Sequence, residues 1–506
     1  MKTTRRDLFK FAAGGAAGLL LTPAPWRLVT DTALWSENWP GIPRPVRGEL
    51  RTRFTHCTLC PAGCPVKARC VGDQPIALAG LPGRPLCAFG LSGHQLPYHA
   101  DRVTEGDIET VRTLVSKRAA TESVAVLDLR PGRTASWTYR RAMAALPRGI
   151  YLAPQSAVPA VNLDAVKTIL SLGVPVLDGW GTPAKVLAAR PHFRLIQAEP
   201  MESHTAMLAD EWLQLRPGSE QALAEALAGQ GGGERTGLSA EQIGSVARQL
   251  AQGGALVLAT QESPAVIELN HRVGAYGQTI VARREAAVPP SWRPAAPTTA
   301  LDALPDRSIG VLLIDESAAD VYLPWTALES KLAAHAFVVT FASSRAGYGR
   351  YARLTLPAPV FPESSDDCVP AVDSLAATFR LAVPLVTPPR GVASPTQFIA
   401  KLANLPASNA LRERADAIHA VGRGTLQQYA DSRVVSIKTI KRDEFWKGLN
   451  EGGSWTDDAG GKTPPLEPLP SAPAVVVMSW EMRAARGPMP PLVSKLYRES
   501  NLRVRT

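Results

Sequence analysis

Four cysteines near the start of the chain are the residues best suited to chemistry: Cys57, Cys60, Cys64 and Cys87. The first three follow the pattern C-x2-C-x3-C, and the fourth comes after a gap of 22 residues. Thiolate sulfur is a soft ligand that selects iron–sulfur clusters and zinc over harder metals. Three cysteines crowded into one loop favour a [4Fe-4S] cluster, because zinc sites more often show two separated C-x2-C pairs. Zinc and disulfide bonds remain the alternatives.

The first residues of the chain have the pattern of an export signal. Arg5 and Arg6 precede a short apolar run over residues 11–21, which three glycines interrupt. This run is shorter than the roughly 20 apolar residues of a membrane-spanning helix. The paired arginines favour the twin-arginine route, which exports proteins already folded around a cofactor, over an ordinary secretory signal. We therefore expect a signal over residues 1–25 and a protein on the periplasmic side of the inner membrane. Cleavage of the signal and its retention as an anchor both stay open.

The composition is that of a large globular protein. The 506 residues, of which 45% are hydrophobic, leave room for more than one domain-sized core. Only six cysteines occur, so the chain is not a disulfide-stabilised scaffold. The formal net charge of +10 suits an anionic membrane surface or an acidic partner subunit. Nucleic acid is a poor candidate partner, because the lysines and arginines are scattered and the protein is expected to be exported.

Short apolar runs alternate with alanine- and leucine-rich stretches through most of the chain. The runs predict parallel strands at 124–127, 149–152, 193–196, 255–258, 309–314 and 337–341. The stretches 220–228 and 240–252 suit helices. Strands that alternate with helices predict an α/β fold whose sheets are covered on both faces. We expect an extended arm over 26–49, a [4Fe-4S] module over 50–103, and two Rossmann-like parallel-sheet blocks over 104–235 and 236–405.

The last hundred residues have a different character. Residues 405–430 look helical, residues 450–473 are rich in glycine and proline, and one strand is expected over 475–478. The end of the chain, from Arg483, is basic and mixed with prolines. We expect residues 406–506 to form a helix followed by an irregular basic docking tail, and a frayed terminus is the alternative.

The cysteine module resembles the N-terminus of the molybdopterin oxidoreductase superfamily. The matching residues include the cysteines themselves, His56, Gly63, the run Arg84-Pro-Leu-Cys87 and the phrase from Leu96 to Val103. Further on, Trp212-Leu-Gln-Leu-Arg216-Pro217-Gly218-Ser219 is similar to the family's W-x-x-x-R-P-G-T-D segment. The stretch from Pro357 through Glu363 to Leu402 resembles the family's late substrate-domain boundary. The resemblance covers roughly residues 50 to 405.

The chain also departs from the family pattern in three ways. Active members place a lysine two residues after the fourth cysteine, between cluster and pterin, and the residue here is Phe89. No cysteine stands between Cys87 and Cys368, so a thiolate ligand to molybdenum from that region is excluded, whereas a serine or aspartate ligand is not. Residues 406–506 are too few and too irregular for the family's pterin-binding barrel, which we expect to be absent or reduced.

The resemblance therefore implies a member that keeps the fold and one [4Fe-4S] cluster but lacks molybdopterin and molybdenum. Such subunits occur in menaquinone reductase complexes and alternative complex III, and the tail from Met489 to Arg503 is similar to theirs. The implied partners are a ferredoxin-like multi-cluster subunit, a multihaem cytochrome c and an integral membrane quinone-binding subunit. The implied role is electron transfer or partner binding, without catalytic residues. Two alternatives stay open, a short but active molybdenum bis-pterin oxidoreductase and a purely structural subunit with no redox cofactor.

Other reactive residues receive structural interpretations. His56 is expected to form a hydrogen bond near the cysteine loop, since four thiolates already suffice for a cluster. Cys70 is expected to be a small buried hydrophobic residue. Cys368 follows a run of acidic residues, 363–367, which we interpret as an exposed acidic loop rather than a metal site. The glycines of 229–233 lack the spacing of a phosphate loop and predict a flexible connector.

Overall fold

The computed structural model describes residues 4–21, 48–154, 158–260, 262–317, 323–406, 409–430, 433–438 and 440–458. The chain divides into two compact units, Met1–Leu50 and Arg51–Thr506. The first contains helix α1 (Arg5–Leu21), which covers most of the expected signal. Among the described residues, no helix is both long and apolar enough to cross a membrane. Most of the expected arm over 26–49 and all of the tail beyond residue 458 lie outside the described residues.

The cysteine module is built on a three-stranded sheet in the order β1-β2-β3. The strands are β1 (Leu50–His56), β2 (Pro65–Val71) and β3 (Gln74–Ala79), and they are followed by α3 (Ala88–Ser92) and the 3₁₀ helix η1 (Gly93–Tyr98). Alternate residues of β2, namely Val66, Ala68 and Cys70, are fully buried, as a strand with one covered face requires. Cys70 is thus part of the hydrophobic core of the module, as expected.

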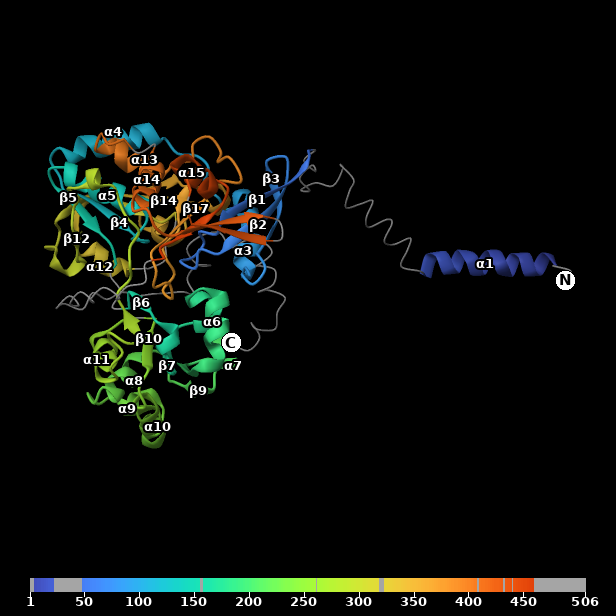
Figure 1. Cartoon of the computed structure of the whole chain (residues 1–506), viewed down its shortest axis with the longest axis horizontal. Helices are drawn as coiled ribbons and strands as arrows, with labels where there is room; N and C mark the ends of the chain where they lie inside the picture. Colours follow the sequence, from blue (N-terminus) through green and yellow to red (C-terminus); the bar gives the residue numbers. More distant parts are fainter. Residues whose placement is uncertain are drawn as a thin grey trace. The chain divides into compact units, whose positions relative to one another are not determined.

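A six-stranded parallel sheet forms the main body of the second unit, in the order β12-β5-β4-β13-β14-β15 (Figure 1). Its strands are β4 (Val124–Asp128), β5 (Gly149–Leu152), β12 (Thr298–Thr299), β13 (Ile309–Asp315), β14 (Leu332–Ala342) and β15 (Leu354–Pro357). One face packs on α4 (Ile108–Ala119), α5 (Thr134–Ala145) and α13 (Pro395–Leu402), and the other on α12 (Trp325–Glu329). Burial on both faces explains why β4 and β13 read as continuous apolar runs.

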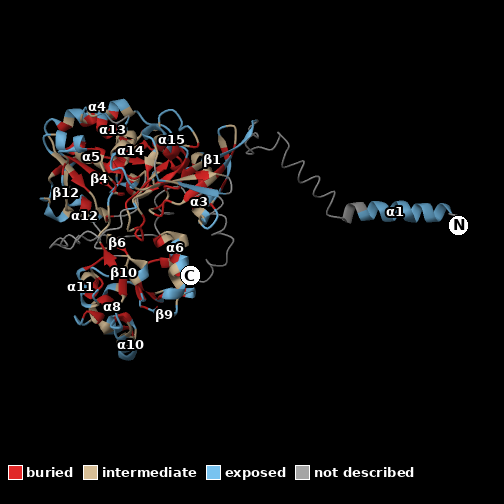
Figure 2. Ribbon diagram, in the orientation of Figure 1, coloured by how far each residue is buried: buried red, intermediate tan, exposed pale blue. Residues whose placement is uncertain are grey.

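A second parallel sheet, β10-β7-β8-β9, is inserted between β5 and β12. Its strands are β7 (Thr168–Leu172), β8 (Arg194–Glu199), β9 (Glu211–Gln214) and β10 (Ala255–Ala259). It packs on α8 (Glu220–Leu227), α10 (Ala240–Leu250) and α11 (Pro264–Arg272) on one face and on α6 (Pro183–Ala189) on the other. Buried residues follow the strands of both sheets, drawn red in Figure 2.

The expected α/β fold with two parallel-sheet blocks is confirmed, but the sheets do not divide the chain at residue 235. Strand β10 pairs with β7, which belongs to the preceding block. Strand β13 pairs with β4, and a hydrogen bond joins Gly310 to Ser123, which comes 187 residues earlier in the chain. The apolar runs predict where strands lie, but their periodicity carries no information on which strand pairs with which. An insertion of one sheet into another is therefore not readable from the pattern.

The region after residue 365 forms a five-stranded antiparallel sheet, β16-β17-β20-β18-β19. Its strands are β16 (Asp366–Asp367), β17 (Thr378–Ala382), β18 (Thr425–Ala430), β19 (Arg433–Ile437) and β20 (Ser454–Thr456), and it packs on α14 (Ala410–Ala420) and α15 (Arg442–Asn450). The expectations of helix throughout 405–430 and of loose chain from 450 are wrong at β18 and β20. β20 is stabilised as a strand by pairing with β17, which lies far from it in sequence, and β18 by pairing with β20 and β19. No closed barrel occurs among the residues through 458 that the structure describes.

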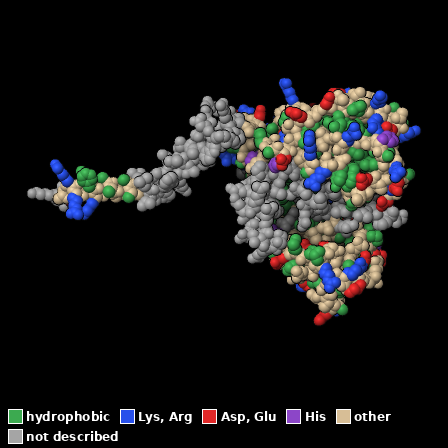
Figure 3. All heavy atoms as spheres, turned by 180° about the vertical axis from the view of Figure 1, so that it is seen from behind, with side chains coloured by type: hydrophobic (Ala, Val, Ile, Leu, Met, Phe, Trp, Pro, Cys, Tyr) green, Lys and Arg blue, Asp and Glu red, His purple; other side chains and the backbone are tan. Residues whose placement is uncertain are grey.

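Charged side chains of both signs are interspersed on the face of the molecule shown in Figure 3, drawn blue and red. This distribution agrees with the scattered lysines and arginines of the sequence.

Candidate functional site

All four cysteines of the predicted cluster line one cavity of about 360 Å³. Cys57 follows β1 directly, Cys60 and Cys64 lie in the turn before β2, and Cys87 immediately precedes α3. Cys57 and Cys60 are buried, Cys64 is half-buried and Cys87 is exposed, and all four are free thiols rather than disulfides. The rest of the cavity wall comes from the ends of β4 and β13 and from the segments 359–366 and 388–397.

The turn that carries the first three cysteines is closed by backbone hydrogen bonds. The Cys57 amide donates to the Cys64 carbonyl over 2.8 Å, and the Gly63 amide donates to the Cys60 carbonyl over 3.3 Å. Gly63 has φ +55°, and a Cβ atom there would lie 3.0 Å from both the Cys368 Cβ and an Arg380 nitrogen. Glycine fits this position because the left-handed conformation and the close neighbours both disfavour a side chain.

The four sulfurs are close enough to interact electrostatically. Burial raises the pKa of the Cys57 thiol, and the charges of Cys60, Cys87 and Cys64 raise it further. Burial, followed by Cys60 and Cys87, raises the pKa of Cys64 to about 12 against the opposing charge of Arg380. Four negatively charged thiolates can therefore be held this close together only if cations between them balance the charge.

The donor set fits an iron–sulfur cluster, in which each thiolate binds a different iron of the cubane. Among the described residues, no group of three or more His, Cys, Asp or Glu side chains is arranged to hold a metal ion as it stands. If a cluster is bound, Cys57, Cys60, Cys64 and Cys87 would hold it, and it would supply one-electron transfer.

The cysteine module is held against β17 and the chain that follows it. The His56 Nδ1 donates to the Leu381 carbonyl over 3.0 Å, and the Thr55 hydroxyl donates to the Val383 carbonyl over 2.8 Å. Burial, together with the charge of Arg380, lowers the pKa of His56 to about 3, so the imidazole is neutral. His56 therefore makes the hydrogen bond that was expected of it.

A buried ion pair joins the end of the module to the cavity wall. Arg102 donates two hydrogen bonds to the Glu363 carboxylate, over 2.6 and 2.5 Å, and both side chains are at most 2% exposed. The Arg102 guanidinium also donates to the Pro97 carbonyl over 2.9 Å. Paired geometry of this kind is what allows two charges to be buried together.

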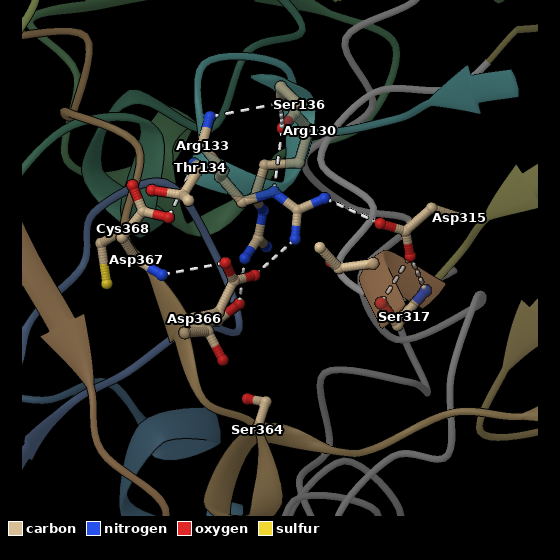
Figure 4. Close-up of polar contacts among 12 residues, drawn as sticks. Arg130, Arg133, Thr134, Ser136, Asp315, Ser317, Ser364, Asp366, Asp367 and Cys368 are labelled. Carbon is tan, nitrogen blue, oxygen red and sulfur yellow. Dashed lines mark hydrogen bonds and ion pairs between the residues drawn. The ribbon is translucent and has the colours of Figure 1, made fainter. Parts of the chain in front are cut away.

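A second charged cluster lies where β4 and β13 end, at the carboxyl edge of the six-stranded sheet (Figure 4). The Arg133 guanidinium donates to Asp315 over 2.8 Å and to Asp366 over 2.5 Å, and it lies 3.4 Å from Asp128. Burial raises the pKa of Asp315, but the charge of Arg133 and hydrogen bonds from Ser317 and Tyr139 outweigh this and leave it below its usual value. Burial and the neighbouring Asp367 keep the pKa of Asp366 raised in spite of Arg133.

The expectation of an exposed acidic loop before Cys368 is wrong. Glu363, Asp367 and Cys368 are all buried, each less than 9% exposed. The segment is buried because arginines from distant elements neutralise it: Glu363 pairs with Arg102, and Asp367 pairs with Arg414 over 2.9 Å. Cys368 approaches the cysteine turn, with its sulfur 3.9 Å from the Cys57 carbonyl. Burial raises the pKa of this thiol to about 12.

The site residues that sequence reasoning missed are mostly arginines. Arg130, Arg133 and Arg380 all contact the cavity wall or the cysteine turn. Only Arg133, which pairs with Asp366, had a signal in the sequence, because the carboxylates at 363–367 require basic partners once they are buried.

The cavity wall is a poor match for a pterin nucleotide. Phe89, in the position of the family's bridging lysine, lines the cavity with an apolar ring. Arg133 is engaged by three carboxylates, of which Asp315 and Asp366 also line the cavity. Carboxylates along this wall would repel the phosphates of such a nucleotide.

Comparisons with known proteins point to one group. No protein-family model matches the chain. A curated protein named menaquinone reductase, molybdopterin-binding-like subunit, from Nitratidesulfovibrio vulgaris strain Hildenborough, is 28% identical over 274 residues. The match covers 45% of this chain and 40% of the relative, so the chain spans less than half the length of the curated relative. Acetylene hydratase from Pelobacter acetylenicus has a similar structure, with a TM-score of 0.54 and 13% identity over 80% of this chain and 74% of that one.

These similarities confirm the resemblance that the cysteine module predicted. The structural match concerns the fold alone, and it agrees with an α/β architecture of the molybdopterin-oxidoreductase type. The chain is thus similar in sequence to the molybdopterin-binding-like subunit of a menaquinone reductase and similar in fold to acetylene hydratase.

Proposed function

We propose that this chain is the molybdopterin-oxidoreductase-like subunit of a quinone-linked respiratory complex, and that it transfers electrons through one [4Fe-4S] cluster. The observation that carries the proposal is the gathering of Cys57, Cys60, Cys64 and Cys87 on one cavity as free thiols. The similarity to a menaquinone reductase subunit supports the setting in a respiratory complex. The substrate of the complex is then a quinone bound at a different subunit.

The proposal includes no molybdenum and no pterin, and no catalytic residue in this chain. Phe89 and the carboxylate-lined wall beside Arg133 support this part of the proposal. A cluster held by the four cysteines would supply one-electron transfer, so the chain would pass electrons on without making or breaking covalent bonds in a substrate. Its potential is set by net charge, hydrogen bonds to sulfur and exposure to solvent.

We further propose that the protein is exported by the twin-arginine route and acts at the periplasmic side of the inner membrane. The paired Arg5 and Arg6 at the start of α1 support this location. The proposed partners are a ferredoxin-like multi-cluster subunit, a multihaem cytochrome c and an integral membrane quinone-binding subunit.

Replacement of single cysteines in the natively purified complex tests the proposed electron transfer. Cys60→Ser removes a buried thiol and Cys87→Ser an exposed one, and Cys70→Ser is the matched control in the core of the same module. We expect both ligand variants to lose the electron paramagnetic resonance signal of one reduced cluster and to lose quinone turnover while the complex remains assembled. We expect Cys70→Ser to retain both. Unchanged turnover in Cys60→Ser and Cys87→Ser would contradict electron transfer and support a purely structural subunit.

A further inference from the structure

We propose that Arg380 is a positioning residue of the cysteine turn and a cation that raises the reduction potential of the cluster bound there. This inference rests on the proposed function, because it requires a cluster held by the four cysteines. Arg380 belongs to β17 of the five-stranded sheet, and it comes 317 residues after Gly63 of the cysteine turn in sequence. Nothing in the sequence pattern around Arg380 indicates this role.

The contacts of Arg380 are with the turn itself. Its Nη1 donates to the Ala62 carbonyl over 3.1 Å and to the Gly63 carbonyl over 3.0 Å, immediately before Cys64. The same nitrogen would lie 3.0 Å from a Cβ atom at Gly63, so guanidinium and turn are packed directly against each other. One nitrogen that bridges two successive carbonyls fixes the orientation of the peptide leading into a cysteine ligand. These hydrogen bonds are charge-assisted and therefore stronger than neutral ones.

Arg380 also acts electrostatically on Cys64. Burial and the sulfurs of Cys60, Cys87 and Cys368 raise the pKa of the Cys64 thiol, and the positive charge of Arg380 lowers it. His56 adds no charge, since its imidazole is neutral.

Arg130 also reaches the cysteine loop, where it donates to the Thr58 carbonyl, but two further arginines of the region are engaged elsewhere. Arg102 pairs with Glu363, and Arg133 pairs with carboxylates at the edge of the six-stranded sheet. Reduction would add one negative charge to the cluster, and a half-buried cation packed against the cysteine turn would stabilise the reduced state.

Potentiometric titration of the natively purified complex, followed by electron paramagnetic resonance, tests the inference. Arg380→Gln removes the charge and keeps a hydrogen-bond donor, whereas Arg380→Lys keeps the charge and loses the planar fork. We expect the cluster midpoint potential to fall in Arg380→Gln and to stay close to the wild-type value in Arg380→Lys. Arg53→Gln is the matched control, because Arg53 donates to the carbonyls of Pro384 and Leu385 on the same side of the module without contacting the cysteine turn.

Each outcome separates this inference from the proposed function. An Arg380→Gln variant with full iron content and an unchanged midpoint potential overturns the role of Arg380 and leaves the cluster in place. A wild-type complex without iron in this subunit overturns the proposed function itself. If the Arg380→Gln variant loses its iron, the Arg380→Lys variant provides the test. Iron retained in the lysine variant, with a wild-type midpoint potential, supports the inference. Loss of iron in the lysine variant as well overturns the assignment of a charge effect.

Discussion

Glu363→Gln should destabilise the junction between the cysteine module and the cavity wall. The change keeps the size of the side chain but removes the negative charge that pairs with Arg102, in a place where both side chains are at most 2% exposed. Of the two hydrogen bonds of 2.6 and 2.5 Å, a glutamine oxygen can accept one, and its NH₂ group faces the other guanidinium donor. Breaking a buried pair by removing one partner costs about 3–5 kcal/mol. That is a large share of the roughly 5–15 kcal/mol by which a domain is stable.

Chemical denaturation of the purified protein, followed by tryptophan fluorescence together with release of bound iron, measures this effect. We expect the transition that releases iron to move to clearly lower denaturant concentration in Glu363→Gln. Because a chain with several sheets need not unfold in two states, the shift of that midpoint is the quantity to compare. Arg102→Met combined with Glu363→Met should recover much of the loss, since an apolar pair leaves no buried charge.

The matched control is a more exposed ion pair, which lies before β13 and β14 at the amino edge of the six-stranded sheet. Lys331 contacts Asp306 over 2.7 Å, but the Asp306 side chain is 71% exposed, so Asp306→Asn should cost less than about 1 kcal/mol. If Glu363→Gln shifts the midpoint no more than Asp306→Asn does, the reasoning from burial is refuted.

Three further substitutions test the geometry of the site. Gly63→Ala should lower iron content and stability, since a left-handed residue with a side chain costs about 1–2 kcal/mol before any steric clash. Iron analysis and thermal unfolding measure the two effects, and wild-type values for both would contradict the account of the turn. Cys368→Ser should leave iron content unchanged, because we assign the four ligands elsewhere, and a loss of iron would make Cys368 a ligand. Tyr139→Phe removes a hydrogen bond of 2.8 Å to buried Asp315 and should lower the free energy of unfolding by about 1.5–3 kcal/mol, measured by chemical denaturation. An unchanged free energy of unfolding would show that Asp315 does not need this donor.

Local sequence patterns predicted the elements of the fold well, because each depends on neighbouring residues. The run from Ile309 to Ile314 is apolar at every position since both faces of its strand are covered, and it is indeed a buried central strand. Pairing between distant strands left no such local trace. The insertion of one parallel sheet into the other, and the strand at Thr425–Ala430, were therefore missed.

The candidate site likewise has one part that local sequence predicts and another part that it does not. The spacing of the cysteines predicted that they gather, and they line one cavity. The acidic residues before Cys368 were interpreted as exposed because their basic partners, Arg102 and Arg414, come from elements remote in sequence. Arg380 was missed for the same reason, since only the packing of β17 against the module brings it to the cysteine turn. Long-range ion pairs and hydrogen bonds are decided by tertiary structure, not by local pattern.

The most direct test of the central claim is the iron and molybdenum content of this subunit in the natively purified complex. Mass spectrometry of the metals, resolved to this chain and normalised to its amount, gives both numbers in one experiment. The account predicts about four irons per chain, as one cubane requires, and no molybdenum. One molybdenum per chain would contradict it and make this protein an active molybdenum enzyme.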